Sequence, residues 1–168
     1  MLDISDLKSL VAAIRPHVSS RGTLIGVEGH STSGKTTLSK TLADQLGGTV
    51  VSTDDYVDSG SNHDSYPRRI RLGELRKDLA HVRSLQPVVF FEGICLRRTL
   101  ELISLVPKIF VYCKRISRAG LWADDPQNHT ENGRPLPGLS WVDLQSVVYH
   151  LRAKPLENAD LVYAWQEE

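Results

Sequence analysis

The sequence predicts an α/β fold with three layers, in which helices cover both faces of a parallel β-sheet. Three observations point to it. Short apolar runs alternate with segments of helical periodicity, a pattern typical of βαβ units. The apolar runs are continuous, as strands buried on both faces require. Five such runs occur without an internal repeat or a linker between them, so we expect a single domain over residues 1–168.

The elements are expected in a definite order along the chain. A first amphipathic helix places apolar residues at i, i+3, i+4 and i+7 and ends before Pro16; these residues are Leu7, Leu10, Val11 and Ile14. The expected strands are TLIGV (23–27), TVVS (49–52), PVVFFEG (87–93), KIFVYC (108–113) and ADLVYAW (159–165). The other helices are expected from Lys35 to a stop at Gly47, around 72–82, over 97–106, from near Lys114, and from Trp141 after a Ser140–Asp143 capping box.

Two long polar segments interrupt this alternation. The first is TDDYVDSGSNHDSYPRRIR (53–71), and the second is ADDPQNHTENGRPLPG (123–138). Loops of this length are uncommon in a compact domain and are usually functional. We expect the second, within a lid segment of approximately 114–139, to close over a bound ligand and exclude water.

Composition excludes several classes of protein. The formal net charge is +0 and the pI is about 7.0, which argues against nucleic acid as a partner. The two cysteines, Cys95 and Cys113, are too few for a disulfide framework or a metal site and are expected to be buried thiols. Acids precede any apolar run at the N-terminus, and no run approaches the ~20 residues of a membrane span. We therefore expect a soluble, cytoplasmic protein without a membrane partner, whose oligomeric state the sequence leaves open.

One loop carries most of the functional information. The stretch GHSTSGKT matches G-x-x-x-x-G-K-[ST] in full and lies between a predicted strand and a predicted helix. Its backbone N–H groups and the helix N-terminus suit a phosphate group. Lys35 is expected between the β- and γ-phosphates of a nucleoside triphosphate, and the Thr36 hydroxyl on Mg²⁺. The candidate ATP-binding residues are Gly29, His30, Ser31, Thr32, Ser33, Gly34, Lys35, Thr36 and Thr37.

Acidic residues follow two of the predicted strands. In open α/β sheets, ligands bind at the carboxyl ends of the strands, where Asp54, Asp55 and Glu92 are expected. A phosphoryl acceptor hydroxyl needs a carboxylate that takes its proton, and Asp54 is the candidate general base. Glu92 is expected to hold the water shell of the metal or the hydroxyls of the acceptor. Thr36, Asp54 and Glu92 are the candidate Mg²⁺ ligands, whereas Asp55 is either a substrate contact or a solvated turn residue.

Cationic residues occur after the fourth strand and after the first long loop. Arg115 and Arg118 are expected three residues apart on one helix face, either as lid groups that stabilise transferred charge or as an ordinary solvated face. The run that contains Arg68, Arg69 and Arg71 is either solvated or in contact with an anionic acceptor. Glu28, at the end of a buried strand, is expected to pair with a neighbouring cation.

Four stretches together resemble the uridine kinase and nicotinamide riboside kinase group of P-loop nucleoside kinases: IGVEGHSTSGKTTLSKTLADQL, VVSTDDY, VVFFEGI and KIFVYCKRISRAG. The resemblance implies a P-loop NTPase fold with a five-stranded parallel sheet, and a last strand, ADLVYAW, beside the base of ATP. It implies Asp54 at the 5′-hydroxyl of the acceptor, Glu92 near the metal and the ribose, and both Arg115 and Arg118 at the lid. Tyr56 would approach the acceptor or pack under the loop.

The leading hypothesis is an ATP- and Mg²⁺-dependent kinase that acts on a hydroxyl of a nucleoside or a similar small molecule. Its catalytic residues would be Lys35, Asp54, Glu92, Arg115 and Arg118, and its substrate contacts Asp54, Asp55, Tyr56 and Glu92. A nucleotide-binding switch or regulatory module is the alternative, although the chain lacks an Asn-Lys-x-Asp motif. A degenerate kinase that scaffolds a partner is a third reading.

Overall fold

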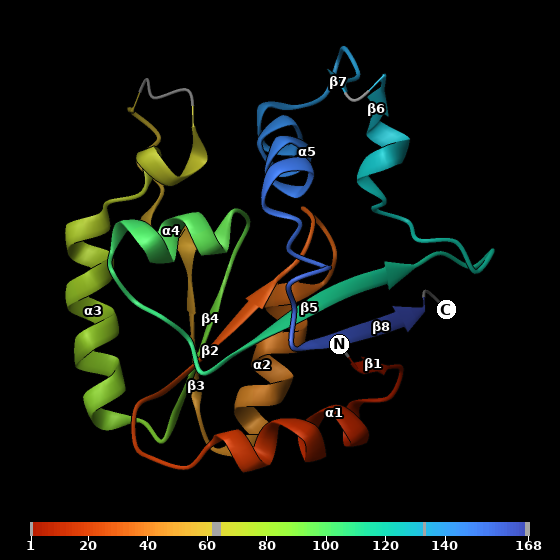
Figure 1. Cartoon of the computed structure of the whole chain (residues 1–168). Coiled ribbons are helices and arrows are strands. Elements are labelled where there is room, and N and C mark those ends of the chain that lie inside the picture. The colour runs from red at the N-terminus through yellow and green to blue at the C-terminus, as the bar shows by residue number, and fades with distance from the viewer. Residues whose placement is uncertain (1, 62–64, 133, 167–168) are drawn as a thin grey trace.

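A computed structural model describes residues 2–61, 65–132 and 134–166 (Figure 1). Its helices are α1 (Leu7–Ile14), α2 (Lys35–Leu46), α3 (Leu72–Leu85), α4 (Leu96–Leu102) and α5 (Trp141–Ala153). Its strands are β1 (Leu2–Ile4), β2 (Thr23–Glu28), β3 (Thr49–Ser52), β4 (Val88–Glu92), β5 (Ile109–Ile116), β6 (Thr130–Glu131), β7 (Arg134–Pro135) and β8 (Leu161–Gln166). The predicted alternation of strands and helices is therefore observed.

The main sheet has six parallel strands in the order β1-β8-β5-β2-β4-β3. The expectation of five strands was wrong, because β1 adds an edge strand beside β8. β1 has only three residues, so its short run carries no clear periodicity. The five predicted strands all lie in this sheet, and their carboxyl ends meet at one edge, where the phosphate loop follows β2.

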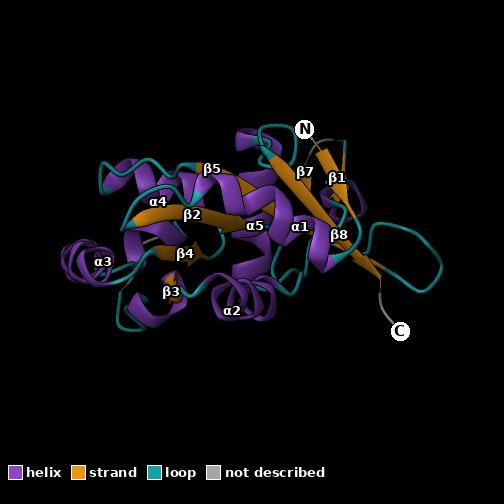
Figure 2. Ribbon diagram, turned by 90° about the horizontal axis from the view of Figure 1, so that it is seen from below, coloured by secondary structure: helices purple, strands orange, loops and turns teal. Residues whose placement is uncertain are grey.

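The sheet separates two layers of helices. Alternate residues of the central strands pack on opposite faces: Ile25 and Phe90 belong to the core under α1 and α2, whereas Leu24 and Phe91 belong to the core under α3, α4 and α5. Figure 2 shows α2 on one side of the sheet and α4 on the other. The prediction of a three-layer α/β/α arrangement with both sheet faces buried is confirmed.

The helix ends follow the predicted signals. Gly47 ends α2 in the left-handed region at φ 68°, where its N–H donates to the carbonyl of Ala43. At the start of α5, the Ser140 hydroxyl accepts from the Asp143 N–H, so the predicted cap is present. Cys95 and Cys113 are buried free thiols, as expected. Among the described residues, no helix is long and apolar enough to cross a membrane.

The predicted helix near Lys114 is absent, because β5 continues to Ile116. Lys114, Arg115 and Ile116 pair in parallel register with the last three residues of β8, and this pairing favours the extended conformation. Of the expected lid segment, residues 114–116 belong to β5, and the part after them contains a 3-10 turn (Pro126–His129) and the small β6–β7 hairpin. It lies above the carboxyl edge of the sheet, beside α5 (Figure 1). Residues 62–64 of the first long loop and Gly133 of the second lie outside the described residues.

Candidate active site

The loop between β2 and α2 has the geometry of a phosphate cradle. A side chain at Gly29 would place its Cβ 2.5 Å from the Cys113 carbonyl oxygen and 2.6 Å from Ser33 Oγ, so only glycine fits there. Gly34, at φ +90°, turns the chain into α2, whose first N–H groups then face the loop. The Ser33 hydroxyl is buried without a hydrogen-bond partner among the described residues. The loop thus offers unpaired donors to an anion.

Lys35 lies under this loop. Its side chain is only 7% exposed, and its ammonium group donates to the His30 carbonyl oxygen at 2.6 Å. Burial lowers the pKa of Lys35, while the carboxylates of Glu92, Asp54 and Asp124 act in the opposite direction. A buried ammonium group among carboxylates has a fixed position, which suits contact with the phosphates of a nucleotide.

Thr36 and Glu92 meet across the carboxyl edge of the sheet. The Thr36 hydroxyl donates to Glu92 Oε1 at 3.1 Å, and Glu92, the last residue of β4, is 1% exposed. A hydroxyl and a carboxylate next to a phosphate cradle are the oxygen ligands that Mg²⁺ prefers, with water and phosphate completing its shell. The donor set therefore fits Mg²⁺. No cluster of three or more His, Cys, Asp or Glu residues suited to a metal occurs in the described chain.

Asp54 follows β3 in a 3-10 turn (Thr53–Tyr56) and is exposed. The hydroxyl of Tyr66 donates to Asp54 Oδ1 and accepts from the Thr53 hydroxyl at 2.9 Å. Burial and the bond to Asp54 raise the pKa of Tyr66, so the phenol remains a proton donor. Tyr66 thereby orients one oxygen of the carboxylate, and the other has no partner among the described residues.

Sequence reasoning did not identify Tyr66 as a site residue. It is 3% exposed and lies between Ser65 and Pro67 in the first long loop. A large aromatic residue before a proline inside a polar run is a weak signal for an anchored segment, and nothing local connects it to Asp54. The contact depends on the loop folding back through the Val57–Ile70 bridge.

A cavity of about 310 Å³ brings these groups together. Lys35, Thr36, Asp54 and Glu92 line it, together with Ser31, Thr32, Gly34, Thr37, Ile94 and Val142. Three separate segments of the chain supply the four polar groups, as the rule for carboxyl ends of parallel strands predicts. The arrangement can bind phosphate, support a divalent cation and present a carboxylate to a hydroxyl group.

Other predicted residues are not brought into this cavity. The Tyr56 hydroxyl donates to Asp78 of α3 at 3.0 Å, and the Asp55 carbonyl accepts from Arg71. Neither Tyr56 nor Asp55 is among the described residues that line the cavity. In this structure Tyr56 is partly buried against the core and contacts α3, outside the cavity.

The expected pair of lid arginines is not on one helix face. Arg115 lies in β5, where its guanidinium contacts Asp124 of the lid segment at 2.5 Å, and Asp124 is 3% exposed. Arg118 lies in an exposed turn. The strand pairing of β5 with β8 separates these residues, so Arg115 ties the lid segment to the sheet and Arg118 faces solvent.

Histidine rings join the phosphate loop to the lid segment and to α5. The ring of His30 stacks on His129 at 5.6 Å between centroids and lies 5.3 Å from His150. Burial lowers the pKa of His30. His150 Nδ1 lies 2.7 Å from the Ser146 carbonyl, which only accepts, so Nδ1 carries the proton and Nε2 accepts from the Tyr112 hydroxyl at 2.9 Å. The lid segment and α5 thus pack directly on the loop.

The buried His150 predicts a pH dependence of stability. Burial lowers its pKa from 6.5 to about 4, so the folded state stays neutral while the unfolded state binds a proton. The free energy of unfolding of the wild type, relative to that of His150→Gln, should fall by about 1.4 kcal/mol per pH unit as the pH is lowered from 6.5 towards 4. Urea titrations at half-unit pH steps measure this difference, and a difference that is constant across the window would contradict the assignment.

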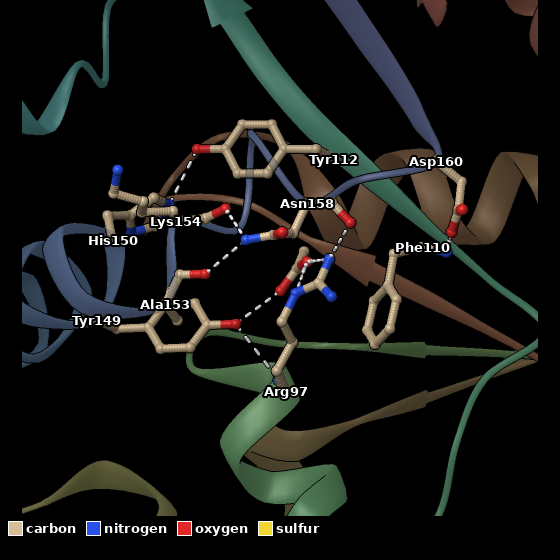
Figure 3. Close-up of polar contacts among 10 residues, drawn as sticks. Arg97, Phe110, Tyr112, Tyr149, His150, Ala153, Lys154, Asn158 and Asp160 are labelled. Atoms are coloured by element: carbon tan, nitrogen blue, oxygen red, sulfur yellow. Dashed lines mark hydrogen bonds and ion pairs between the residues drawn. The ribbon is translucent and has the colours of Figure 1, made fainter. Parts of the chain in front are cut away.

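Glu28 is the buried acid at the end of β2, and its expected cation is Arg97 of α4. The Arg97 guanidinium contacts Glu28 at 2.7 Å, and the Tyr149 hydroxyl of α5 donates to the same carboxylate at 2.7 Å. Burial raises the pKa of Glu28 to about 7, and both partners oppose this shift. Figure 3 shows Arg97 reaching from α4 towards Tyr149 and Asn158. The network ties two helices to the residue that precedes the phosphate loop.

A second, mainly apolar cavity of about 340 Å³ lies beside the phosphate loop and shares Thr32, Gly34 and Thr37 with the first. The rings of Tyr163 and Trp165 from β8 line it beside Gly34 and Leu38. The Trp165 indole N–H donates to the Ser33 carbonyl at 2.8 Å and so has a fixed orientation. Aromatic walls next to a phosphate cradle suit a planar ring system.

The fold and the site define a class of protein with a phosphate-binding loop at the carboxyl edge of a parallel α/β sheet. No family model matches the sequence, and no curated protein matches it. Among solved structures, the chain is similar to a possible uridine kinase from Bacillus stearothermophilus, with a TM-score of 0.57 and 15% identity over 93% of this chain and 98% of that one. A shikimate kinase from Bacteroides thetaiotaomicron has a TM-score of 0.40 and 17% identity over 84% of this chain and 86% of that one. The first of these similarities extends over nearly the whole chain and concerns the fold.

Proposed function

We propose that the protein is an ATP- and Mg²⁺-dependent kinase that transfers a phosphoryl group to a hydroxyl of a nucleoside or a similar small molecule. One observation carries this proposal: Lys35, Thr36, Glu92 and Asp54 line a single cavity. A site that only binds phosphate would need Lys35 and Thr36 but neither carboxylate. The carboxylates of Glu92 and Asp54 add a metal-supporting group and a proton acceptor.

Each of these groups has a role in the proposed reaction. The loop N–H groups and Lys35 bind the phosphates, and Thr36 with Glu92 holds Mg²⁺, which neutralises charge on the transferred group. Asp54, oriented by Tyr66, accepts the proton of the attacking hydroxyl. The lid segment contacts β5 through Asp124 and the phosphate loop through His129, and its proposed role is to close over the bound nucleotide and exclude water.

The apolar cavity beside β8 supports ATP as the donor. Tyr163 and Trp165 provide ring surfaces for the base, and the cavity shares Gly34 with the phosphate loop. This arrangement agrees with the resemblance, which places the last strand beside the base of ATP. The nucleoside acceptor is carried by the resemblance alone.

A coupled ADP-release screen tests the proposal. Nucleosides, nicotinamide riboside, pantothenate and simple sugars are supplied with ATP and Mg²⁺, and the rate without acceptor is subtracted. We expect acceptor-dependent ADP release, lost in the absence of Mg²⁺, for at least one compound. Tight, selective GTP binding with no transfer to any acceptor would instead favour the switch, and ATP binding with no transfer would favour the scaffold.

A further inference from the structure

A third cavity, of about 860 Å³, lies between α4, α5 and residues 65–68. Four arginines line it, namely Arg68, Arg97, Arg98 and Arg152, and we refer to it as the arginine groove. It shares no described lining residue with the cavity that contains Asp54. The proposed phosphoryl transfer does not use it.

The positive charge of the arginine groove is local, because the whole chain has a formal net charge of +0. Two of its arginines have carboxylate partners: Arg97 contacts Glu28 and Arg98 contacts Glu101. The other two, Arg68 and Arg152, have no carboxylate partner within residues 2–61, 65–132 and 134–166. Two guanidinium groups therefore face the groove with no carboxylate from the described chain to neutralise them.

The chemistry of these two groups defines a ligand. A guanidinium presents N–H donors in a planar fork that matches the oxygens of a carboxylate or a phosphate. Both Arg68 and Arg152 are exposed, so an incoming anion reaches them without displacing a buried ion pair. We propose that the arginine groove binds the carboxylate or phosphate group of a small metabolite, with Arg68 and Arg152 as its contacts.

The groove is connected to the candidate base through one short segment. Ser65 and Pro67 line the groove, and the ring of Tyr66 between them extends to Asp54. The Tyr66 backbone N–H also donates to the side chain of Gln145, another groove residue, at 3.2 Å. An anion bound at Arg68 therefore restrains the segment that orients Asp54. This effect on turnover rests on the proposed function, whereas the binding itself does not.

Calorimetric titration of the full chain tests the binding. The phosphate loop is first filled with a non-hydrolysable ATP analogue and Mg²⁺, and the probes are then inorganic phosphate and succinate, with neutral succinamide as the control. We expect the anionic probes to bind at least tenfold more weakly to the Arg68→Gln/Arg152→Gln double variant. Arg76→Gln, an exposed arginine on α3 outside the groove, should leave binding unchanged.

Two results would overturn the site. One is unchanged binding of phosphate and succinate in the double variant. The other is loss of binding in Lys35→Ala with no loss in the double variant, which would locate the anion at the phosphate loop. Because both substituted arginines are exposed, we expect the double variant to keep the midpoint of thermal unfolding of the wild type. A melting curve of each protein measures this midpoint.

Turnover assays separate two sources of the anionic group. A tenfold rise in KM for a charged acceptor in the double variant, with kcat and the KM for ATP unchanged, assigns the group to the acceptor. A change in wild-type turnover of a neutral acceptor on adding succinate or phosphate, absent in the double variant, assigns it to a separate metabolite. Weakened probe binding in a chain that phosphorylates nothing would support the groove and overturn the kinase. Phosphoryl transfer by the wild type, together with unchanged probe binding in the double variant, would support the kinase and overturn the groove.

Discussion

Lys35→Ala should lower kcat with the acceptor that the screen identifies by a hundredfold to a thousandfold. Lys35 places an ammonium group beneath the phosphate loop, 7% exposed and beside Glu92 and Asp54. Charge that develops on the transferred phosphoryl group is stabilised there by a donor that needs no reorganisation, and loss of one such donor costs roughly this much. The coupled ADP-release assay at saturating acceptor measures the effect.

Lys40→Ala is the matched control, because this lysine is exposed on the same helix. It should retain wild-type kcat within about twofold, since surface substitutions away from a site change little. Thermal melting of both variants separates loss of chemistry from loss of folding. A Lys35→Ala variant that stays folded and transfers phosphoryl at the wild-type rate would remove the phosphate loop from the mechanism.

The phosphate loop was predictable because its signal is contiguous. Eight residues, Gly29 to Thr36, carry the motif, and the strand before them and the helix after them are regular in sequence. The close approach at Gly29 and the left-handed φ at Gly34 are requirements that only glycine meets cheaply, so the sequence displays them directly. The position of Asp54 and Glu92 at the same edge of the sheet was also predictable, because topology fixes which ends of parallel strands meet.

The strand extension at Lys114–Ile116 was not predictable in the same way. Local charge and spacing favoured a basic helix, but pairing with Ala164, Trp165 and Gln166 makes the segment a strand. The partner residues lie about fifty positions away, and tertiary pairing overrides local propensity. The edge strand at Leu2–Ile4 was missed for a related reason, since its partner in β8 lies at the other end of the chain.

Side-chain contacts between distant segments were the least predictable part of the site. The sequence indicated that Glu28 needs a cation, but only the fold selects Arg97, which lies 69 positions later. Tyr66 reaches Asp54 only because the first long loop folds back on itself. These contacts set the orientation of groups whose presence the sequence already indicated.

Asp54→Asn should lower kcat at least about a hundredfold while leaving the KM for ATP nearly unchanged. Asparagine keeps the size of the side chain and can still accept from the Tyr66 hydroxyl, but it cannot take a proton from the acceptor. Loss of a positioned general base typically lowers the rate by a factor on the order of 10²–10⁴. The Lys35 loop is intact in this variant, so nucleotide binding should persist. Initial rates with varied ATP and varied acceptor give both constants.

Asp55→Asn is the informative comparison, because the neighbouring acid lies in the same turn but outside the described lining of the cavity. Its kcat should stay within about threefold of the wild type, since an exposed turn carboxylate has no proton to accept. If Asp54→Asn transfers phosphoryl at an undiminished rate, Asp54 is not the base. If Asp55→Asn instead shows the hundredfold loss, the base is the second acid, and the turn adopts another arrangement when the acceptor binds. The pair of variants therefore decides which carboxylate after β3 acts on the hydroxyl.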